Sequence, residues 1–201
     1  MEKKYISNSK DTVRMFKSDF LESLSKIHYS VPIYLYFPVI VFCMIKSFLV
    51  GVNPLAFFLL FGVGLVVWTF VEYIMHRYVF HFVPKSKMGL RLHFIIHGVH
   101  HDYPNDARRL VLPPAVSVPL AIGFYYLFRL ILGPEYLWSF FGAFLLGYLV
   151  YDIGHYAMHH YNFKNRIFKK IKDHHMLHHY KDQDKGYGVS SPLWDKIFHS
   201  K

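Results

Sequence analysis

Four long runs of apolar residues constrain the fold of this chain more than any other feature. The runs cover residues 31–50, 55–75, 115–132 and 136–158. Each is close to the ~20 residues that an α-helix needs to cross a lipid bilayer. The stretch LAFFLLFGVGLVVWTF within the second run lacks the polar face that a helix of a soluble domain carries. The runs predict an all-α integral membrane protein with four transmembrane helices in two hairpins.

The basic residues predict how these helices are oriented. Of the 23 Lys and Arg, 21 lie before the first run, between the second and third, or after the fourth. The turns at 51–54 and 133–135 contain none. Because basic segments stay in the cytoplasm, both chain ends and the segment between the hairpins are expected there. We therefore predict a cytosolic N-terminal segment at 1–30 and a membrane domain at 31–201, whose helical cytosolic cap comprises residues 76–112 and 159–201.

The net charge of +10 and the single cysteine restrict the partners further. The charge favours attraction to anionic lipid headgroups, and no nucleic-acid partner is expected because no DNA- or RNA-binding motif accompanies it. Cys43 lies in the first run, so neither an intramolecular disulfide nor a thiolate metal site is expected.

The polar start does not resemble a cleavable signal peptide. We expect a multi-pass protein of a bacterial cytoplasmic membrane, or of the endoplasmic reticulum in a eukaryote, with its site facing the cytoplasm.

The histidines are gathered on the side that is predicted to be cytoplasmic. Thirteen of the fifteen lie in four segments, at 76–81, 93–101, 155–160 and 174–179. Spacings of three and four residues, as in His97/His101 and His155/His159, place two imidazoles on one helix face, where they can share a metal ion. The alternative is a set of surface histidines, which does not explain why four segments converge. About ten histidines exceed the needs of one ion, so two metals are expected.

The sequence narrows the choice of metal only partly. An all-imidazole site suits Zn, Cu, Fe or Ni, and a zinc protease is not supported because the H-E-x-x-H motif is absent. Glu72 and Asp152 lie one helical turn before His76 and His155. They are candidates to accept the far N–H of these histidines, as carboxylates near metals commonly do. The alternative for Glu72 is an ion pair with Arg77.

Four motifs resemble the fatty acid hydroxylase/sterol desaturase superfamily. They are EYIMHRYVFH (72–81), HFIIHGVHHDYPNDARRLVLPP (93–114), YDIGHYAMHH (151–160) and HHMLHHYKDQDKGYGVSSPLWDKIF (174–198). Within that superfamily the chain is most similar to the fatty acid 2-hydroxylases, which act on sphingolipid acyl chains. The similarity extends from about residue 16 to the end.

The resemblance implies a non-haem dimetal centre of two iron ions, with O2 as co-substrate, although zinc could occupy the sites in an isolated protein. Carried over position by position, it implies two sets of five ligands. One set is His76, His81, His97, His101 and His178; the other is His100, His155, His159, His175 and His179. His93 and His160 match positions behind the ligands, and His174 is an extra residue beside the motif. His28 and His199 are expected to be ordinary surface residues.

The implied reaction is the O2-dependent hydroxylation of C2 of an acyl chain, either free or in a sphingolipid such as ceramide. Some family members carry an N-terminal cytochrome b5 domain, and none is expected before Val31. The electron donor is then a separate protein of cytochrome b5 or ferredoxin type, with its reductase. Asp106, Arg108 and Arg109 follow the second histidine segment and are candidates for contact with a lipid headgroup.

Three alternatives stay open at this point. Another lipid oxygenase on the same scaffold, such as a sterol, alkane or carotenoid hydroxylase or a desaturase, would use the same histidines. A non-catalytic membrane metal-binding or transport protein is disfavoured, because a transporter needs polar residues deep in its helices and here the histidines lie at their ends. A redox-inactive zinc hydrolase is the third.

Overall fold

Apolar helices form the main body of the protein, for which a computed structural model describes residues 5–201. Residues 1–4, the start of the predicted cytosolic segment, lie outside the described part. The long helices are α2 (Val31–Leu49), α3 (Pro54–Ile74) and α6 (Pro114–His160). Residues 31–49, 54–80 and 114–160 are each long and apolar enough to cross a membrane. The helix boundaries lie close to those of the predicted apolar runs.

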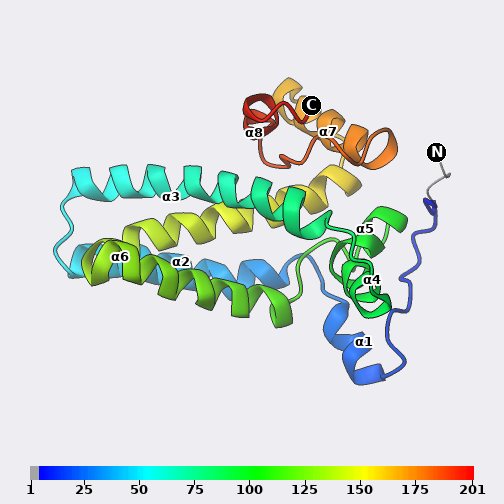
Figure 1. Ribbon diagram of the computed structural model, residues 1–201. Coiled ribbons are helices and arrows are strands. Elements are labelled where there is room, and N and C mark those ends of the chain that lie inside the picture. The colour runs from blue at the N-terminus through cyan, green and yellow to red at the C-terminus, as the bar shows by residue number, and fades with distance from the viewer. Residues whose placement is uncertain (1–4) are drawn as a thin grey trace.

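The helix α6 is two helices joined by a sharp break at Gly133. This residue has φ 73° and ψ 175°, a conformation that glycine adopts without the steric cost borne by other residues. The turn predicted at 133–135 is therefore concentrated in one residue, and Pro134 begins the second arm. The two arms, residues 114–132 and 134–160, lie side by side in Figure 1. The bundle thus contains four apolar rods.

The second arm of α6 lies at the centre of the bundle. Both α2 and α3 pack mainly against α6 rather than against one another, so the predicted first hairpin is an open one. The second arm supplies most of the buried core, in which Phe140, Phe141 and Phe144 pack with residues of α2 and of the first arm. Apolar side chains also cover the outside, where Leu130 is 86% exposed. An apolar exterior around an apolar core is what a lipid environment favours.

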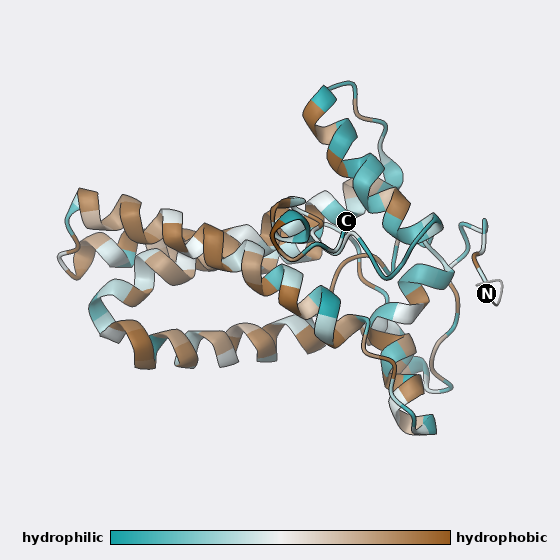
Figure 2. Ribbon diagram, turned by 45° about the horizontal axis from the view of Figure 1, so that its top comes forward, coloured by the Kyte–Doolittle hydropathy of each residue, from teal (hydrophilic) through white to brown (hydrophobic). Residues whose placement is uncertain are grey.

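The remaining elements gather at one end of the bundle, where both chain ends also lie (Figure 1). They are α1 (Asp19–Ser25), η1 (Met75–Phe80), α4 (Lys87–His93), η2 (Phe94–Gly98), α5 (Val99–Asp102), α7 (Arg166–Tyr180) and α8 (Leu193–Ile197). Figure 2 shows hydrophilic residues concentrated at this end and hydrophobic ones along the bundle. No strand occurs in residues 5–201, which confirms the all-α prediction for this part of the chain.

Two glycines let α3 approach the second arm of α6 closely. A Cβ atom on Gly147 would lie 2.6 Å from the Trp68 ring, and one on Gly64 would collide with the carbonyl oxygen of Phe140. Gly62, on the exposed side of the same helix, has nothing within 4 Å of such an atom. The contact between these helices therefore depends on the missing side chain at Gly64 and Gly147.

We predict that Gly64→Ala destabilises the protein by about 1–3 kcal/mol, because the added methyl group forces the two backbones apart. Gly62→Ala, the matched control two residues away, should be neutral or stabilising by up to about 1 kcal/mol, since alanine favours the helix. Thermal unfolding in detergent micelles measures both. Equal midpoints for the two variants would contradict this description of the helix contact.

Candidate metal centre

Ten histidines at the polar end of the bundle form two groups of five. In each group, one ring nitrogen from every member lies within 4.8 Å of those of all the others. The first group contains His76, His81, His97, His101 and His178, and the second contains His100, His155, His159, His175 and His179. These are the same sets that the resemblance implies. Eight of the ten side chains are buried, and those of His81 and His159 are partly buried.

The first group depends on a wide helical turn at the end of α3. His76 and His81 are five residues apart, which would point their side chains about 140° apart on an α-helix. The segment η1 is instead π-helical, and the backbone N–H of His81 donates to the His76 carbonyl at 3.1 Å. The two Nε2 atoms consequently lie 3.3 Å apart. Such π-turns occur frequently at functional sites.

Consecutive histidines are divided between the groups. His100 belongs to the second group and His101 to the first, and His179 and His178 are divided in the same way. Adjacent residues on a helix point about 100° apart, so each pair contributes one ring to each side. The rings of His101 and His179 stack across the boundary with centroids 4.3 Å apart. The two groups are therefore neighbours within one site.

The ring nitrogens of the first group fit a shared ion better than a hydrogen-bonded cluster. Nε2 of His97 lies 3.2 Å from that of His76 and 3.1 Å from that of His81. Nδ1 of His76 donates to the Tyr187 carbonyl at 2.6 Å, which leaves its Nε2 as a lone pair in the neutral ring. At most two of the three contacts among these nitrogens can then be hydrogen bonds. Adjacent nitrogens bound to one ion at about 2.1 Å lie about 3 Å apart.

The second group contains buried nitrogens that no protein group satisfies. Both ring nitrogens of His100 and of His179 lack a hydrogen-bond partner in the described structure, as does Nε2 of His155. Nε2 of His159 lies 2.9 Å from Nε2 of His175. Buried polar atoms are nearly always paired, so these nitrogens call for a ligand. Each neutral ring has one lone pair, and a metal ion would accept one from each of these rings.

Burial keeps these rings neutral. It lowers the pKa of His97, His100, His101, His175 and His179 well below the usual range, and the neighbouring imidazoles lower it further. A neutral imidazole has a lone pair for a metal, whereas a protonated one does not. The cluster is therefore ready for metal binding at neutral pH without first losing protons.

Backbone carbonyl groups accept hydrogen bonds from several of the rings, at the ring nitrogen that points away from the other histidines. Nδ1 of His178 donates to the Lys185 carbonyl at 2.6 Å, as that of His76 does to the carbonyl of Tyr187. His155 and His159 make corresponding bonds to the backbone of Leu110 and Pro104. These partners fix which nitrogen of each ring faces the other histidines.

The prediction that Glu72 accepts a bond from His76 is wrong, because Tyr187 fills that place. The Glu72 carboxylate instead accepts the backbone N–H groups of Val189 and Ser190, at 2.7 and 2.8 Å, and the Ser190 hydroxyl at 2.5 Å. Glu72 thereby links α3 to the loop that carries the Tyr187 carbonyl. It supports the orientation of His76 only through that loop.

Asp152 differs from its prediction in the same way. Its carboxylate accepts the Leu112 backbone N–H at 3.1 Å and the Tyr148 hydroxyl at 3.2 Å, while His155 bonds to the backbone of Leu110. Asp152 therefore fastens the chain segment that precedes α6, and that segment supplies the partner of His155.

Arg77 does not form the alternative ion pair with Glu72 in the described structure. Its Nη1 donates to the Tyr73 hydroxyl at 2.5 Å. Its guanidinium also lies over the rings of Tyr73, Tyr78 and Tyr187. Aromatic faces, rather than a carboxylate, thus surround this cation.

The other histidines lie outside both groups. His93 is partly buried, and His160 is exposed and packs against the ring of Tyr156. The positions behind the ligands that were predicted for these two residues stay a prediction. His28 and His199 are exposed, as expected of surface residues.

His174 and Asp195 form a contact that the sequence did not indicate. Asp195 accepts the backbone N–H groups of Tyr187 and Gly188, the Ser200 hydroxyl at 2.9 Å and Nε2 of His174 at 3.1 Å. Burial alone would raise the pKa of Asp195, but the hydrogen bond from His174 and the other three donors lower it below its ordinary value. The ionised carboxylate thus fixes the loop behind His76.

An apolar cavity connects the histidines with the core of the bundle. It encloses about 1040 Å³ of space between protein atoms, its open mouth included. Its walls include Trp68, Leu120, Phe124, Phe144 and Leu145 from α3 and both arms of α6. At its polar end it is lined by His97 of the first group and by His100 and His155 of the second. Its apolar lining suits a lipid-like ligand.

Comparison with known proteins identifies the family. The family model described as fatty acid hydroxylase matches residues 61–200, which contain all ten clustered histidines. The chain belongs to the fatty acid hydroxylase family. The prediction made from the four histidine motifs is thereby confirmed.

Family members that are similar to this chain come from plants, animals and fungi. The dihydroceramide fatty acyl 2-hydroxylase FAH1 of Arabidopsis thaliana is 38% identical over 191 residues, which cover 94% of this chain and 80% of that protein. The fatty acid 2-hydroxylase of Mus musculus is 36% identical over 94% of this chain and 56% of its own length. A solved structure of full-length scs7p, in which only the hydroxylase domain is visible, has a TM-score of 0.85 at 39% identity. It covers 90% of this chain and 69% of its own.

We predict that Asp195→Asn weakens metal binding by about tenfold or more, because groups behind the ligands contribute 10–100-fold to affinity. The neutral amide loses acceptor capacity for the four donors, which frees the loop behind His76. Asp184→Asn, an exposed residue of the same loop, is the matched control. Chelator titration followed by elemental analysis measures the metal that each variant retains. Identical chelator midpoints would contradict the role of Asp195.

Proposed function

We propose that this family member hydroxylates C2 of an acyl chain, free or within a sphingolipid such as ceramide, in an O2-dependent reaction. The cavity carries the proposal, because it joins walls fit for an acyl chain to histidines of both groups. The names of the relatives, which include dihydroceramide fatty acyl 2-hydroxylase and fatty acid 2-hydroxylase, supply the substrate class and the position.

The four apolar rods are proposed to cross the membrane, with the histidine end in the cytoplasm. The long helices have the length and apolarity for this, and Gly133 divides the longest into two crossings. Nearly all basic residues belong to the segments gathered at the histidine end, which the positive-inside rule assigns to the cytoplasm. This placement brings the site level with the headgroups of its lipid substrate.

Each group of five histidines is proposed to hold one iron ion. When bound, such a pair of ions supplies the activation of O2 that C–H hydroxylation requires. Neutral, buried imidazoles are suitable ligands for iron and equally for zinc, so an isolated protein can contain zinc. In each of the pairs His100/His101 and His178/His179, one histidine belongs to each group. These neighbouring residues link the two proposed metal sites through the backbone.

The chain itself binds and orients the substrate. Leu120, Phe124 and Leu145 receive the acyl tail within the bundle, which leaves the carboxyl-derived end beside His97 and His100. C2 is the first methylene next to that end, so its position against the histidines follows from the depth to which the tail is buried. The apolar walls exclude water from this carbon.

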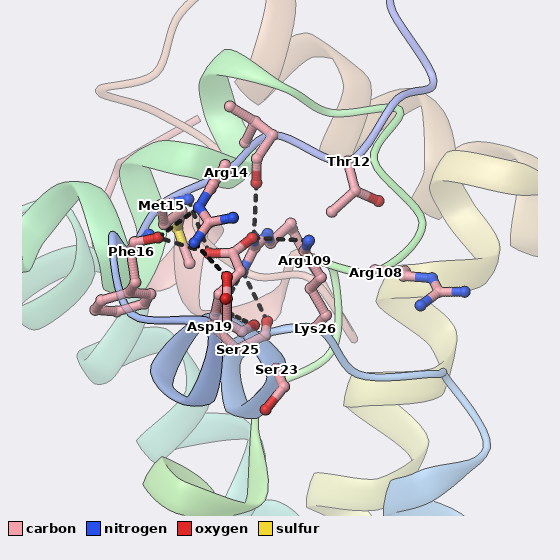
Figure 3. Close-up of polar contacts among 12 residues, drawn as sticks. Thr12, Arg14, Met15, Phe16, Asp19, Ser23, Ser25, Lys26, Arg108 and Arg109 are labelled. Atoms are coloured by element: carbon pink, nitrogen blue, oxygen red, sulfur yellow. Dashed lines mark hydrogen bonds and ion pairs between the residues drawn. The ribbon is translucent and has the colours of Figure 1, made fainter.

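The net reaction consumes one O2, two electrons and two protons, and it yields the 2-hydroxyacyl product and one water. The electrons are proposed to come from a separate protein of cytochrome b5 or ferredoxin type with its reductase. The basic surface of the histidine end suits an acidic protein of that kind. Of the three headgroup candidates, Arg108 alone is exposed, and its side chain points away from the polar contacts around Arg109 (Figure 3).

We predict that cells that express the chain accumulate 2-hydroxyacyl sphingolipids only in the presence of O2. His100→Ala should abolish the product, because it removes a ring that lies at the cavity, whereas His28→Ala changes an exposed residue and should not. Mass spectrometry of hydrolysed lipids gives the position of the hydroxyl group. Sterol or carotenoid products without 2-hydroxyacyl chains would favour another oxygenase of the same scaffold.

We also predict two metal ions per chain, with iron needed for activity. The protein reconstituted anaerobically with iron should consume O2 in the presence of substrate and an electron donor, and the zinc form should not. Elemental analysis should give a metal content near two, lowered in both His100→Ala and His101→Ala, each of which belongs to a different group. Substrate turnover by the zinc form in the absence of O2 would indicate a hydrolase instead.

A further inference from the structure

The N-terminal strap, residues 5–25, crosses the histidine end and is bound to the segment that follows α5. The Ser7 backbone N–H donates to the Asp102 carbonyl at 2.8 Å. Further along, the Thr12 hydroxyl and the Val13 N–H donate to the two carboxylate oxygens of Asp106, at 3.0 and 3.1 Å. The strap lies outside residues 61–200, which the family model matches.

Arg109 is the centre of this attachment, as Figure 3 shows. Its Nη2 donates to the Val13 carbonyl at 2.6 Å and to the Glu22 carboxylate at 2.7 Å. Its Nη1 donates to the Ser25 carbonyl at 3.0 Å and to the Ser25 hydroxyl at 2.5 Å. The side chain is only 1% exposed, and its Nε lies 3.9 Å from Asp106. The buried guanidinium of Arg109 therefore forms hydrogen bonds with both ends of the loop formed by residues 13–25.

Glu22 closes the same loop from the other side. Its second carboxylate oxygen accepts the backbone N–H groups of Met15 and Phe16, both at 3.0 Å. Burial alone would raise the pKa of Glu22, but Lys26, these N–H groups and Arg109 lower it to about 2. The carboxylate is consequently ionised at neutral pH, and the loop around Met15 keeps a fixed shape.

The fixed loop places two strap residues in the cavity. Met15 and Ser25 line it together with Arg109, Leu110 and the histidine end. The residues that receive the tail in the proposed function, such as Phe124 and Leu145, belong to the bundle. The strap therefore forms the wall beside the head of a bound lipid, not beside its tail.

We infer that the strap is a wall of the substrate site, with Met15 determining which acyl headgroups fit and Arg109 acting as the positioning residue that holds Met15 in place. The inference rests on the proposed function, since it names the part of the lipid that this wall contacts. It explains why the polar atoms of Asp106 and Arg109 face the strap rather than a headgroup.

Substrate selection tests Met15 directly. In a competition between palmitic acid and palmitoyl-ceramide, Met15→Ala should change the ratio of the two 2-hydroxy products by at least about threefold, because pocket contacts of this size discriminate by that much or more. The preference among ceramides of different acyl length should stay unchanged. Met88→Ala is the matched control, because this methionine is 83% exposed. An unchanged product ratio, or a change in chain length alone, would overturn the inference.

Limited trypsin digestion tests the strap without turnover. Arg14 and Lys17 are exposed cleavage sites on either side of Met15. Under anaerobic conditions palmitoyl-ceramide should slow cleavage at both by at least about threefold, since a filled cavity keeps the strap closed. The double variant Arg109→Gln/Glu22→Gln removes both buried charges together, and it should be cleaved faster and lose this protection while retaining its metal. Arg91→Gln, on an exposed arginine, is the control.

The two experiments separate this inference from the proposed function. Protection by ceramide in a protein that forms no 2-hydroxy product would leave the strap as a lipid-binding wall and refute the proposed reaction. Hydroxylation with neither ceramide protection nor an altered product ratio would refute the strap and leave the reaction intact.

Discussion

Burial of ten imidazole rings at one end of an apolar bundle is the constraint on which the rest of the structure depends. Their nitrogens face one another at about hydrogen-bond distance, yet neutral imidazoles cannot satisfy all of these contacts. Such an arrangement is costly unless a metal ion accepts the lone pairs. The fold must therefore hold each ring in a fixed orientation, because a ring that rotated would turn its lone pair away from the other histidines.

Backbone carbonyl groups accept hydrogen bonds from the rings and fix their orientation. Carboxylates in turn accept hydrogen bonds from the chain segments that carry these carbonyl groups. His76 and His178 both donate to the loop that follows α7, and that loop is fixed from one side by Glu72 and from the other by Asp195. Neither carboxylate belongs to the two groups of five histidines. The all-imidazole character of the site thus depends on acids that bind backbone N–H groups.

The sequence predicted those features that follow from composition and spacing. Apolar length predicted the long helices, and the turn without basic residues predicted at 133–135 coincides with the break within α6 at Gly133. The distribution of basic residues predicted that the four histidine segments meet at one end, as they do. The π-turn at His76 could not be predicted, because five-residue spacing carries no signal on an α-helix. The partners predicted for Glu72 and Asp152 were wrong because both carboxylates accept backbone N–H groups that lie far away in the sequence.

The strap shows the limit of pattern-based prediction most clearly. Asp106 and Arg109 look like loop charges available to a headgroup, since a sequence does not reveal burial. In the structure their charges hold residues 12–25 in place, and two residues of this segment, Met15 and Ser25, line an apolar cavity. Buried charges thus hold a polar segment of the chain against a cavity that is otherwise lined mainly by apolar side chains, and only the folded structure reveals this contact.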